Sequence, residues 1–158
     1  MIKLIVAHCK NRGIGYKNSI PWNHPDDLTY FAKMTKGTGN NAIIMGANTY
    51  RSIGRTLPNR HNIILSSTLK NPDLTIFTSL DDALNACKIN NIDTVWIIGG
   101  EKVYKEVIEK NIINEIHISE INEEYECDAY FPELPKHYTL AQTTKLTKAI
   151  NIHVFKKT

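Results

Sequence analysis

Two adjacent acids, Asp26 and Asp27, stand at the start of a predicted helix and differ in the face they occupy. Helical spacing puts Asp26 on a mainly polar face that we expect to be solvated, in line with Thr29, Tyr30 and Lys33. It puts Asp27 on the apolar face, in line with Phe31 and Met34 and beside Leu28. A carboxylate there is costly to bury without a partner, and desolvation raises its pKa unless a cation or donor opposes it. Asp27 is therefore either a proton handler or cation receptor, or a first-turn carboxylate that favours the helix dipole.

Apolar runs that end abruptly in glycine mark two candidate phosphate sites. Gly99 and Gly100 follow the run 95–98, Gly46 follows the run 42–45, and a helical pattern begins after each junction. Because glycine has no Cβ, a ligand can touch the backbone there, and the positive end of the next helix suits a phosphate. The alternative at both places is an ordinary turn between strand and helix. Neither junction is the G-x-G-x-x-G dinucleotide fingerprint.

An arginine and a glycine-bearing loop are further candidates for binding. Arg60 lies just before a predicted strand, where its guanidinium either forks onto a carboxylate or is simply solvated. The loop 11–20, which contains Gly13 and Gly15, is either a lid that excludes water from a ligand or a plain surface loop.

Alternation of short β-rich runs with helical patterns predicts an α/β fold. We expect strands at 3–8, 42–45, 62–65, 75–77 and 94–98, and helices at 25–35, 47–53, 80–88 and 102–110. Continuously apolar strands indicate a parallel sheet covered on both faces. The strand-like segments 115–121, 138–144 and 150–156 predict an antiparallel C-terminal edge. The expected fold is thus a central, mostly parallel twisted sheet flanked by about four helices, with ligands at the carboxyl ends of its strands.

Length and composition set limits on the class of protein. We expect the 158 residues to form one domain, 1–158, with an ordinary apolar fraction of 42%. The net charge of +3, without basic blocks, suits a small anionic ligand and does not indicate nucleic-acid binding. The apolar N-terminal run is too short for a secretory signal, and no segment has the length of a membrane span. Cys9, Cys87 and Cys127 are typical of reduced packing thiols, so we expect a cytoplasmic protein, and no metal-ligand spacing is present.

Taken together, these segments resemble dihydrofolate reductase. The matching pieces occur in the family's order, at Gly13–Gly15, 21–28 with Phe31, 45–46 with Thr49 and Ser52, 57–58, 60–67, 98–100 with Val103 and Tyr104, and 128–132. The resemblance runs from the first strand to about Pro132, and the end strands match in pattern. It implies that the chain reduces 7,8-dihydrofolate to tetrahydrofolate with NADPH, binds antifolate inhibitors, and is a monomer.

The resemblance also implies roles for individual residues. Asp27 would bind the ring N–H and 2-amino group of the pterin and promote protonation at N5, through water or tautomerisation, while hydride goes to C6. Ser119 would orient this acid, and Trp22 and Tyr104 would complete the catalytic set. Arg60 would take the glutamate α-carboxylate. The substrate would be lined by Ile5, Val6, Ala7, Asp27, Leu28, Phe31, Ile53, Leu57, Arg60 and Ile98.

The cofactor would lie along the glycine junctions and under the lid, which we define as residues 11–23, with Ile20 over the nicotinamide. The peptide between Gly99 and Gly100 is expected to be cis. The implied cofactor contacts are Ala7, Ile14, Gly15, Asn18, Ser19, Ile20, Gly46, Ala47, Asn48, Thr49, Leu65, Ser66, Ser67, Ile98, Gly99, Gly100, Glu101, Lys102, Val103 and Tyr104. Ala47 departs from the family pattern, because many relatives carry there an arginine that binds the 2′-phosphate. We therefore expect a weaker preference for NADPH over NADH.

Two other functions are compatible with the same architecture. One is a reductase of a ribosylamino-pyrimidine, which we expect to lack the combination of Trp22, Asp27 and Phe31. The other is a non-catalytic binding or assembly protein that has kept the fold. Intact Asp27 and Arg60 argue against such a loss of catalysis.

Overall fold

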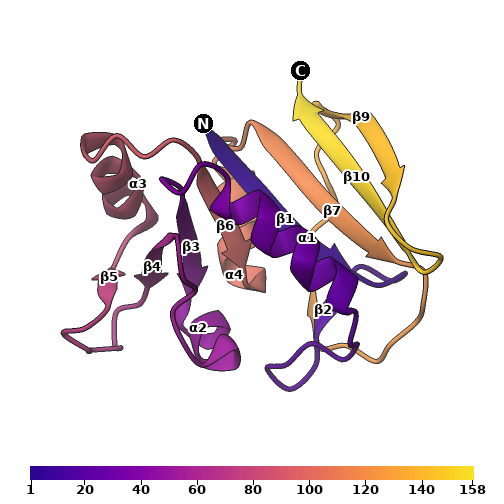
Figure 1. Cartoon of the computed structure of the whole chain (residues 1–158), viewed down its shortest axis with the longest axis horizontal. Helices are drawn as coiled ribbons and strands as arrows, with labels where there is room; N and C mark the ends of the chain where they lie inside the picture. The colour runs from indigo at the N-terminus through magenta and orange to yellow at the C-terminus, as the bar shows by residue number, and fades with distance from the viewer.

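The computed structural model describes all residues, 1–158, around an eight-stranded sheet in the order β5-β4-β3-β6-β1-β7-β10-β9 (Figure 1). From β5 to β7 the strands run parallel, at Thr75–Phe77, His61–Leu65, Ala42–Gly46, Val95–Gly99, Ile2–His8 and Glu115–Ile121 in that order. β9 (Tyr138–Lys145) and β10 (Ile150–Lys157) continue the sheet, with β10 antiparallel to both β7 and β9. The α/β class and the antiparallel C-terminal edge are therefore confirmed.

Four helices flank the sheet, α1 (Pro25–Lys36), α2 (Ala47–Ile53), α3 (Leu80–Ile89) and α4 (Glu101–Glu109). Every helix and every strand of the large sheet begins and ends within one residue of the predicted range. None of the helices is long and apolar enough to cross a membrane.

Two clusters of buried side chains attach the helices to opposite faces of the sheet. Along β1, Leu4 and Val6 belong to the cluster that contains α3 and α4, whereas Ile5 belongs to the cluster covered by α1 and α2. Along β6, Val95 and Ile97 alternate in the same way with Trp96 and Ile98. Full burial of such a side chain stabilises the fold by about 1.5–3 kcal/mol. β3 and β6 are apolar throughout because both of their faces are covered.

A second, two-stranded sheet was not predicted. β2 (Gly13–Gly15) pairs antiparallel with β8 (Ala129–Tyr130), so part of the expected loop is strand. The strands are too short to show a periodic pattern, and their partners lie more than a hundred residues apart in the chain. This pairing fixes one end of the lid to the segment that follows β7 (Figure 1).

The packing around β2 predicts different effects for its two glycines. A Cβ added at Gly13 would lie 2.3 Å from Cys127 Sγ, whereas one at Gly15 would lie 3.4 Å from Ser19 O, an ordinary contact. We expect Gly13→Ala to lower the free energy of unfolding by about 1–3 kcal/mol, because it overpacks a buried contact. The matched control, Gly15→Ala, is expected to change it by less than about 0.5 kcal/mol. Urea unfolding of both variants checks this, and equal stabilities would contradict it.

Candidate active site

Asp27 lies in the first turn of α1 and is half-buried, whereas Asp26 is exposed, as the helical spacing predicted for these two acids. The hydroxyl of Ser119 on β7 faces the Asp27 carboxylate and lowers its pKa. Ser119 is only 2% exposed and stands opposite Ala7 of β1 in the sheet register. The structure therefore brings together the acid and the hydroxyl that were predicted to work as a pair.

Burial raises the pKa of Asp27 above its ordinary value. The hydroxyl of Ser119 and the imidazole of His24 oppose this rise without cancelling it. Desolvation dominates because the apolar face of α1 excludes water from the carboxylate. A carboxyl group with a raised pKa keeps more of its proton as the pH approaches neutrality, which is what a proton donor requires.

Tyr30 corrects part of the prediction for α1. We expected its side chain on the solvated face with Asp26, but it is half-buried and its hydroxyl lies 3.0 Å from His117 Nδ1. Tyr30 follows Asp27 by three residues and Asp26 by four, so it lies between the two helix faces. Tyr30 lies on the face toward the sheet because its ring packs on the buried cluster there and its hydroxyl contacts the buried imidazole of His117. Thr29 and Lys33 are exposed, as predicted.

Tyr104 of α4 approaches Asp27 from the opposite face of the sheet. Its hydroxyl, fully enclosed, donates to the carbonyl oxygen of Ile5 at 2.8 Å. Burial raises the pKa of Tyr104, and the charge of Asp27 adds to the effect. A Cβ at Gly99 would lie 3.3 Å from Tyr104 Oη, and the φ of Gly99 is +124°. Glycine is therefore needed at this position for both space and backbone conformation.

Three predicted glycines lie close together where β3 and β6 end. A Cβ at Gly46 would lie 3.4 Å from Val103 Cγ2, and one at Gly100 would lie 3.3 Å from Thr49 Oγ1. The Gly99–Gly100 peptide bond is cis, as predicted. No side chain caps the first turn of α4, so its N–H groups are available to an anion. This backbone cradle suits a phosphate-bearing ligand.

Several of the other predicted cofactor residues already have protein partners. Ser66 Oγ accepts from the backbone N–H groups of Thr68 and Leu69 at 3.2 and 2.9 Å. Asn48 Oδ1 accepts from Arg51 at 3.2 Å, and Glu101 Oε2 accepts from the N–H of Tyr130 at 2.6 Å. The side chains of Ser67 and Lys102 are exposed, Val103 is buried, and Leu65 and Ala47 are half-buried.

An apolar surface next to Asp27 matches the predicted substrate wall. Phe31, Ile53 and Leu57 are half-buried and pack on the cluster that contains Ile5 and Ile98. Leu28 is 60% exposed although it lies on the apolar side of α1. Val6 does not share this surface, because it packs in the cluster on the α4 face of the sheet. An exposed leucine beside a half-buried acid is suited to the flat, partly apolar ring of a ligand.

Arg60 is held in place by two contacts. Its Nη1 donates to Thr35 Oγ1 of α1 at 3.0 Å, and its Nε donates to the carbonyl of Pro58 at 3.0 Å. Burial lowers the pKa of Arg60, and the nearby charge of Arg55 lowers it further. The sequence analysis missed Thr35, which no spacing singled out, and Asn62, whose amide bonds to Leu57 and Arg60 and shapes this loop.

The lid is bound to the segment between β7 and β8. Asp128 accepts from the N–H of Lys17 at 3.0 Å, and its own N–H donates to Gly15 O at 2.9 Å. The ring of Trp22 packs at 5.5 Å on Tyr125. Ile14 packs against the core, whereas the tip residues Asn18, Ser19 and Ile20 are exposed. Neither Tyr125 nor the contact role of Asp128 was predicted, because the pairing depends on long-range folding.

The whole length of the chain has counterparts among known proteins. The family model described as Dihydrofolate reductase matches residues 1–156. A dihydrofolate reductase of Aedes albopictus is 41% identical over 154 residues, which cover 88% of this chain and 83% of that protein. One of Bacillus subtilis is 37% identical over 154 residues, with 94% and 86% covered. One of Drosophila melanogaster is 35% identical over 147 residues, with 85% and 81% covered.

The raised pKa of Asp27 predicts that this acid destabilises the fold at neutral pH. Since the folded chain holds the proton more tightly than the unfolded chain, stability falls as pH rises from the unfolded pKa of about 3.9 through the folded value. We expect Asp27→Asn to raise the free energy of unfolding at pH 7 by on the order of 1 kcal/mol, because its amide cannot ionise. This gain should vanish below about pH 4. Chemical unfolding across this range measures it.

The adjacent acid provides the control. Asp26→Asn is expected to give no gain at any pH, because Asp26 is exposed in the first turn, where its charge favours the helix dipole. A pH-independent difference between wild type and Asp27→Asn would contradict the prediction.

Proposed function

The chain belongs to the dihydrofolate reductase family, and from this membership we infer which of its residues carry out the reaction. The enzyme reduces 7,8-dihydrofolate to 5,6,7,8-tetrahydrofolate with NADPH. The observation that carries our assignment is the pair of Asp27 and Ser119, a half-buried carboxylate that faces a buried hydroxyl beside an exposed apolar surface.

Asp27 binds and polarises the pterin ring in this proposal. Its carboxylate accepts from the ring N–H and the 2-amino group, and its raised pKa favours a proton at the site. Protonation at N5 makes the C6–N5 imine a better hydride acceptor. Because the acid lies on the side of the pterin away from N5, the proton reaches N5 through water or a ring tautomer. Ser119 holds the carboxylate in the plane that the ring requires.

The remaining substrate contacts follow from the surface around Asp27. Leu28, Phe31, Ile53 and Leu57 cover the pterin and aminobenzoyl rings, and Ile5 and Ile98 lie beneath them. Arg60, held by Thr35 and Pro58, forks onto the glutamate α-carboxylate. Antifolates that reproduce the ring donors of the pterin would bind the same carboxylate.

The cofactor fits the glycine cradle. NADPH supplies the hydride for C6. Gly46, Gly99 and Gly100 leave backbone uncovered where a Cβ would fill the space, and the uncapped start of α4 offers N–H groups to the phosphates. Thr49, Ser66 and Ser67 lie beside these junctions and add hydroxyl groups. Ile20, exposed at the tip of the lid, would cover the nicotinamide.

The alternatives are less well supported. The relatives compared with this chain are named as dihydrofolate reductases, and the residues of the expected signature, Trp22, Asp27 and Phe31, are all present. A pyrimidine reductase or a non-catalytic binding protein has no observation in its favour. A single domain that acts as a cytoplasmic monomer stays our prediction.

The catalytic role of Asp27 is tested by Asp27→Asn. We expect kcat/KM for dihydrofolate near neutral pH to fall by about 10²–10⁴-fold, because the amide cannot supply a proton. The difference in kcat/KM between wild type and Asp27→Asn should become smaller as the pH is lowered, since solvent then protonates the substrate. Loss of absorbance at 340 nm measures turnover, and Asp26→Asn, which makes the same charge change on the solvated face, serves as control. Turnover of Asp27→Asn equal to that of the control would contradict the assignment.

The alanine at position 47 leads to a prediction about the preference for NADPH over NADH. Since a charge-assisted hydrogen bond contributes about 1.5–3 kcal/mol, we expect Ala47→Arg to raise the preference for NADPH over NADH by about tenfold or more. The ratio of the two dissociation constants, from quenching of tryptophan fluorescence, measures this without turnover. Ala47→Gln, which has a long polar side chain but no charge, should leave the ratio near the wild-type value. An unchanged ratio in Ala47→Arg would mean that position 47 does not face the 2′-phosphate.

A further inference from the structure

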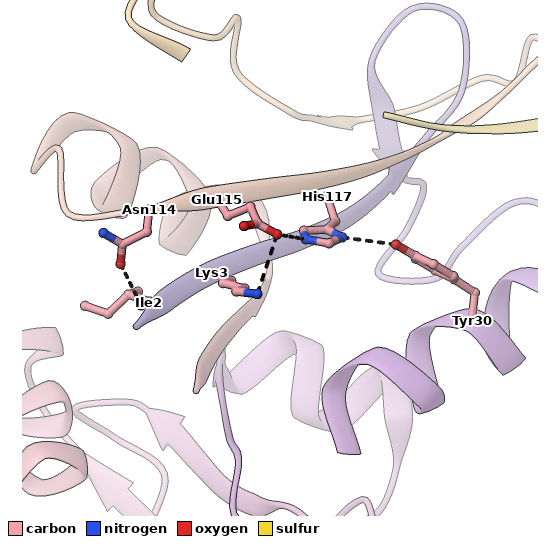
Figure 2. A network of polar contacts seen from close by, with 6 residues as sticks. All are labelled: Ile2, Lys3, Tyr30, Asn114, Glu115 and His117. Atoms are coloured by element: carbon pink, nitrogen blue, oxygen red, sulfur yellow. Dashed lines mark hydrogen bonds and ion pairs between the residues drawn. The ribbon is translucent and has the colours of Figure 1, made fainter. Parts of the chain in front are cut away.

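A chain of polar side chains connects α1 to β7 close to Asp27 (Figure 2). Tyr30 Oη lies 3.0 Å from His117 Nδ1, and His117 Nε2 lies 2.6 Å from Glu115 Oε1. Lys3 Nζ completes the chain at 3.5 Å from the same carboxylate oxygen. His117 is only 4% exposed, so its hydrogen bonds are made in a region from which water is largely excluded. None of these residues belongs to the site proposed above.

The donors and acceptors among these polar side chains can be assigned. A carboxylate only accepts, so His117 Nε2–H donates to Glu115, and Nδ1 is left to accept from the Tyr30 hydroxyl. Burial lowers the pKa of His117 against the opposing effect of Glu115, which keeps the imidazole neutral at pH 7. Burial also raises the pKa of Tyr30, to about 12, with the charges of Asp27 and Glu115 adding to it. Tyr30 therefore keeps its proton and remains a donor.

These polar contacts lie next to the pair formed by Asp27 and Ser119. His117 and Ser119 are two residues apart on β7 and so point to the same face of the sheet. Asp27 and Tyr30 are three residues apart on α1 and so lie one turn apart on neighbouring parts of its surface. α1 therefore contacts β7 at two neighbouring points. Asp27 faces Ser119 at one of them, and Tyr30 contacts His117 at the other.

We propose that Tyr30, His117 and Glu115 are positioning residues that hold α1 against β7 and so keep the Asp27 carboxylate beside the Ser119 hydroxyl. Glu115 fixes the tautomer of His117, His117 fixes Tyr30, and Tyr30 fixes the turn that carries Asp27. The significance for catalysis rests on the proposed function of Asp27, but the positioning itself is independent of it.

Several charged and titratable groups lie around Asp27 and bear on its proton affinity. His24 precedes the same helix, Tyr30 follows within it, and Tyr104 approaches from α4, whereas Glu115 acts on Tyr30 and His117. His117 in turn faces Glu115, Lys3 and Lys156. Tyr30→Phe removes no charge at neutral pH and keeps the ring. A change in the pKa of Asp27 caused by this variant therefore reports position and not a lost charge.

The test is a titration of Asp27 in the ligand-free protein. Carboxyl carbons are labelled with ¹³C in aspartate, and the Asp27 signal is identified by its loss in Asp27→Asn. Because the Ser119 hydroxyl favours the carboxylate, we expect Ser119→Ala to raise the pKa of Asp27. Tyr30→Phe should raise it in the same direction, by about half a pH unit. In the double variant the pKa should be no higher than in Ser119→Ala alone, since Tyr30 acts through that contact.

Tyr138→Phe is the matched control. Tyr138 is a buried tyrosine on β9 whose hydroxyl donates to Ile113 O at 2.9 Å, so its loss weakens the fold elsewhere. We expect this variant to lower the unfolding midpoint without moving the pKa of Asp27. An unmoved pKa of Asp27 in Tyr30→Phe, or a double variant with additive shifts, would overturn the proposal. Because no turnover is measured, failure here is distinct from failure of the catalytic assignment, which the activity of Asp27→Asn decides.

Discussion

Partial removal of water from the Asp27 carboxylate is unfavourable, and the contacts between α1 and β7 are arranged around it. The hydroxyl of Ser119 and the imidazole of His24 both lower the pKa of the acid, yet this pKa remains raised. Complete compensation would leave a carboxylate that never holds a proton near neutral pH. No compensation would leave a group whose burial weakens the fold. The site lies between these limits because a single hydroxyl, and no cation in ion-pair range, faces the acid.

Side chains from both faces of the sheet affect Asp27, and they approach one another at the end of β6. α1 approaches from one face and α4 from the other, and each is attached by its own buried cluster. Tyr104 nevertheless contributes its hydroxyl to Ile5 O and has its pKa affected by Asp27. It reaches that point by passing Gly99, where a side chain would crowd the phenol. The glycine that we propose to open the backbone to the cofactor therefore also lets Tyr104 of α4 approach the acid.

The fold was predictable from the sequence where burial imposes a local pattern. The apolar runs of β1, β3 and β6 identify strands covered on both faces, and the helical spacing of Asp26 and Asp27 separates an exposed acid from a half-buried one. The pairing of β2 with β8 and the contact of Tyr30 with His117 leave no such pattern. Tyr30 lies between two helix faces, so its direction depends on a partner 87 residues away. The role of Ser119 came from the family resemblance, since an isolated serine in a strand has no distinguishing spacing.

The lid illustrates how such long-range contacts join parts of the site. Its first half is paired through β2 and through Asp128, and the residue that follows its second half, His24, contacts Glu123 through Nε2 at 2.8 Å. Glu123 also accepts from Tyr125, whose ring packs on Trp22. The segment between β7 and β8 therefore holds both ends of the lid, while Ile20 at the tip between them is exposed. Because His24 immediately precedes α1, its contact with Glu123 also lies near Asp27, whose pKa the imidazole lowers. One histidine therefore contacts the segment that follows β7 and also affects the proton affinity of the acid.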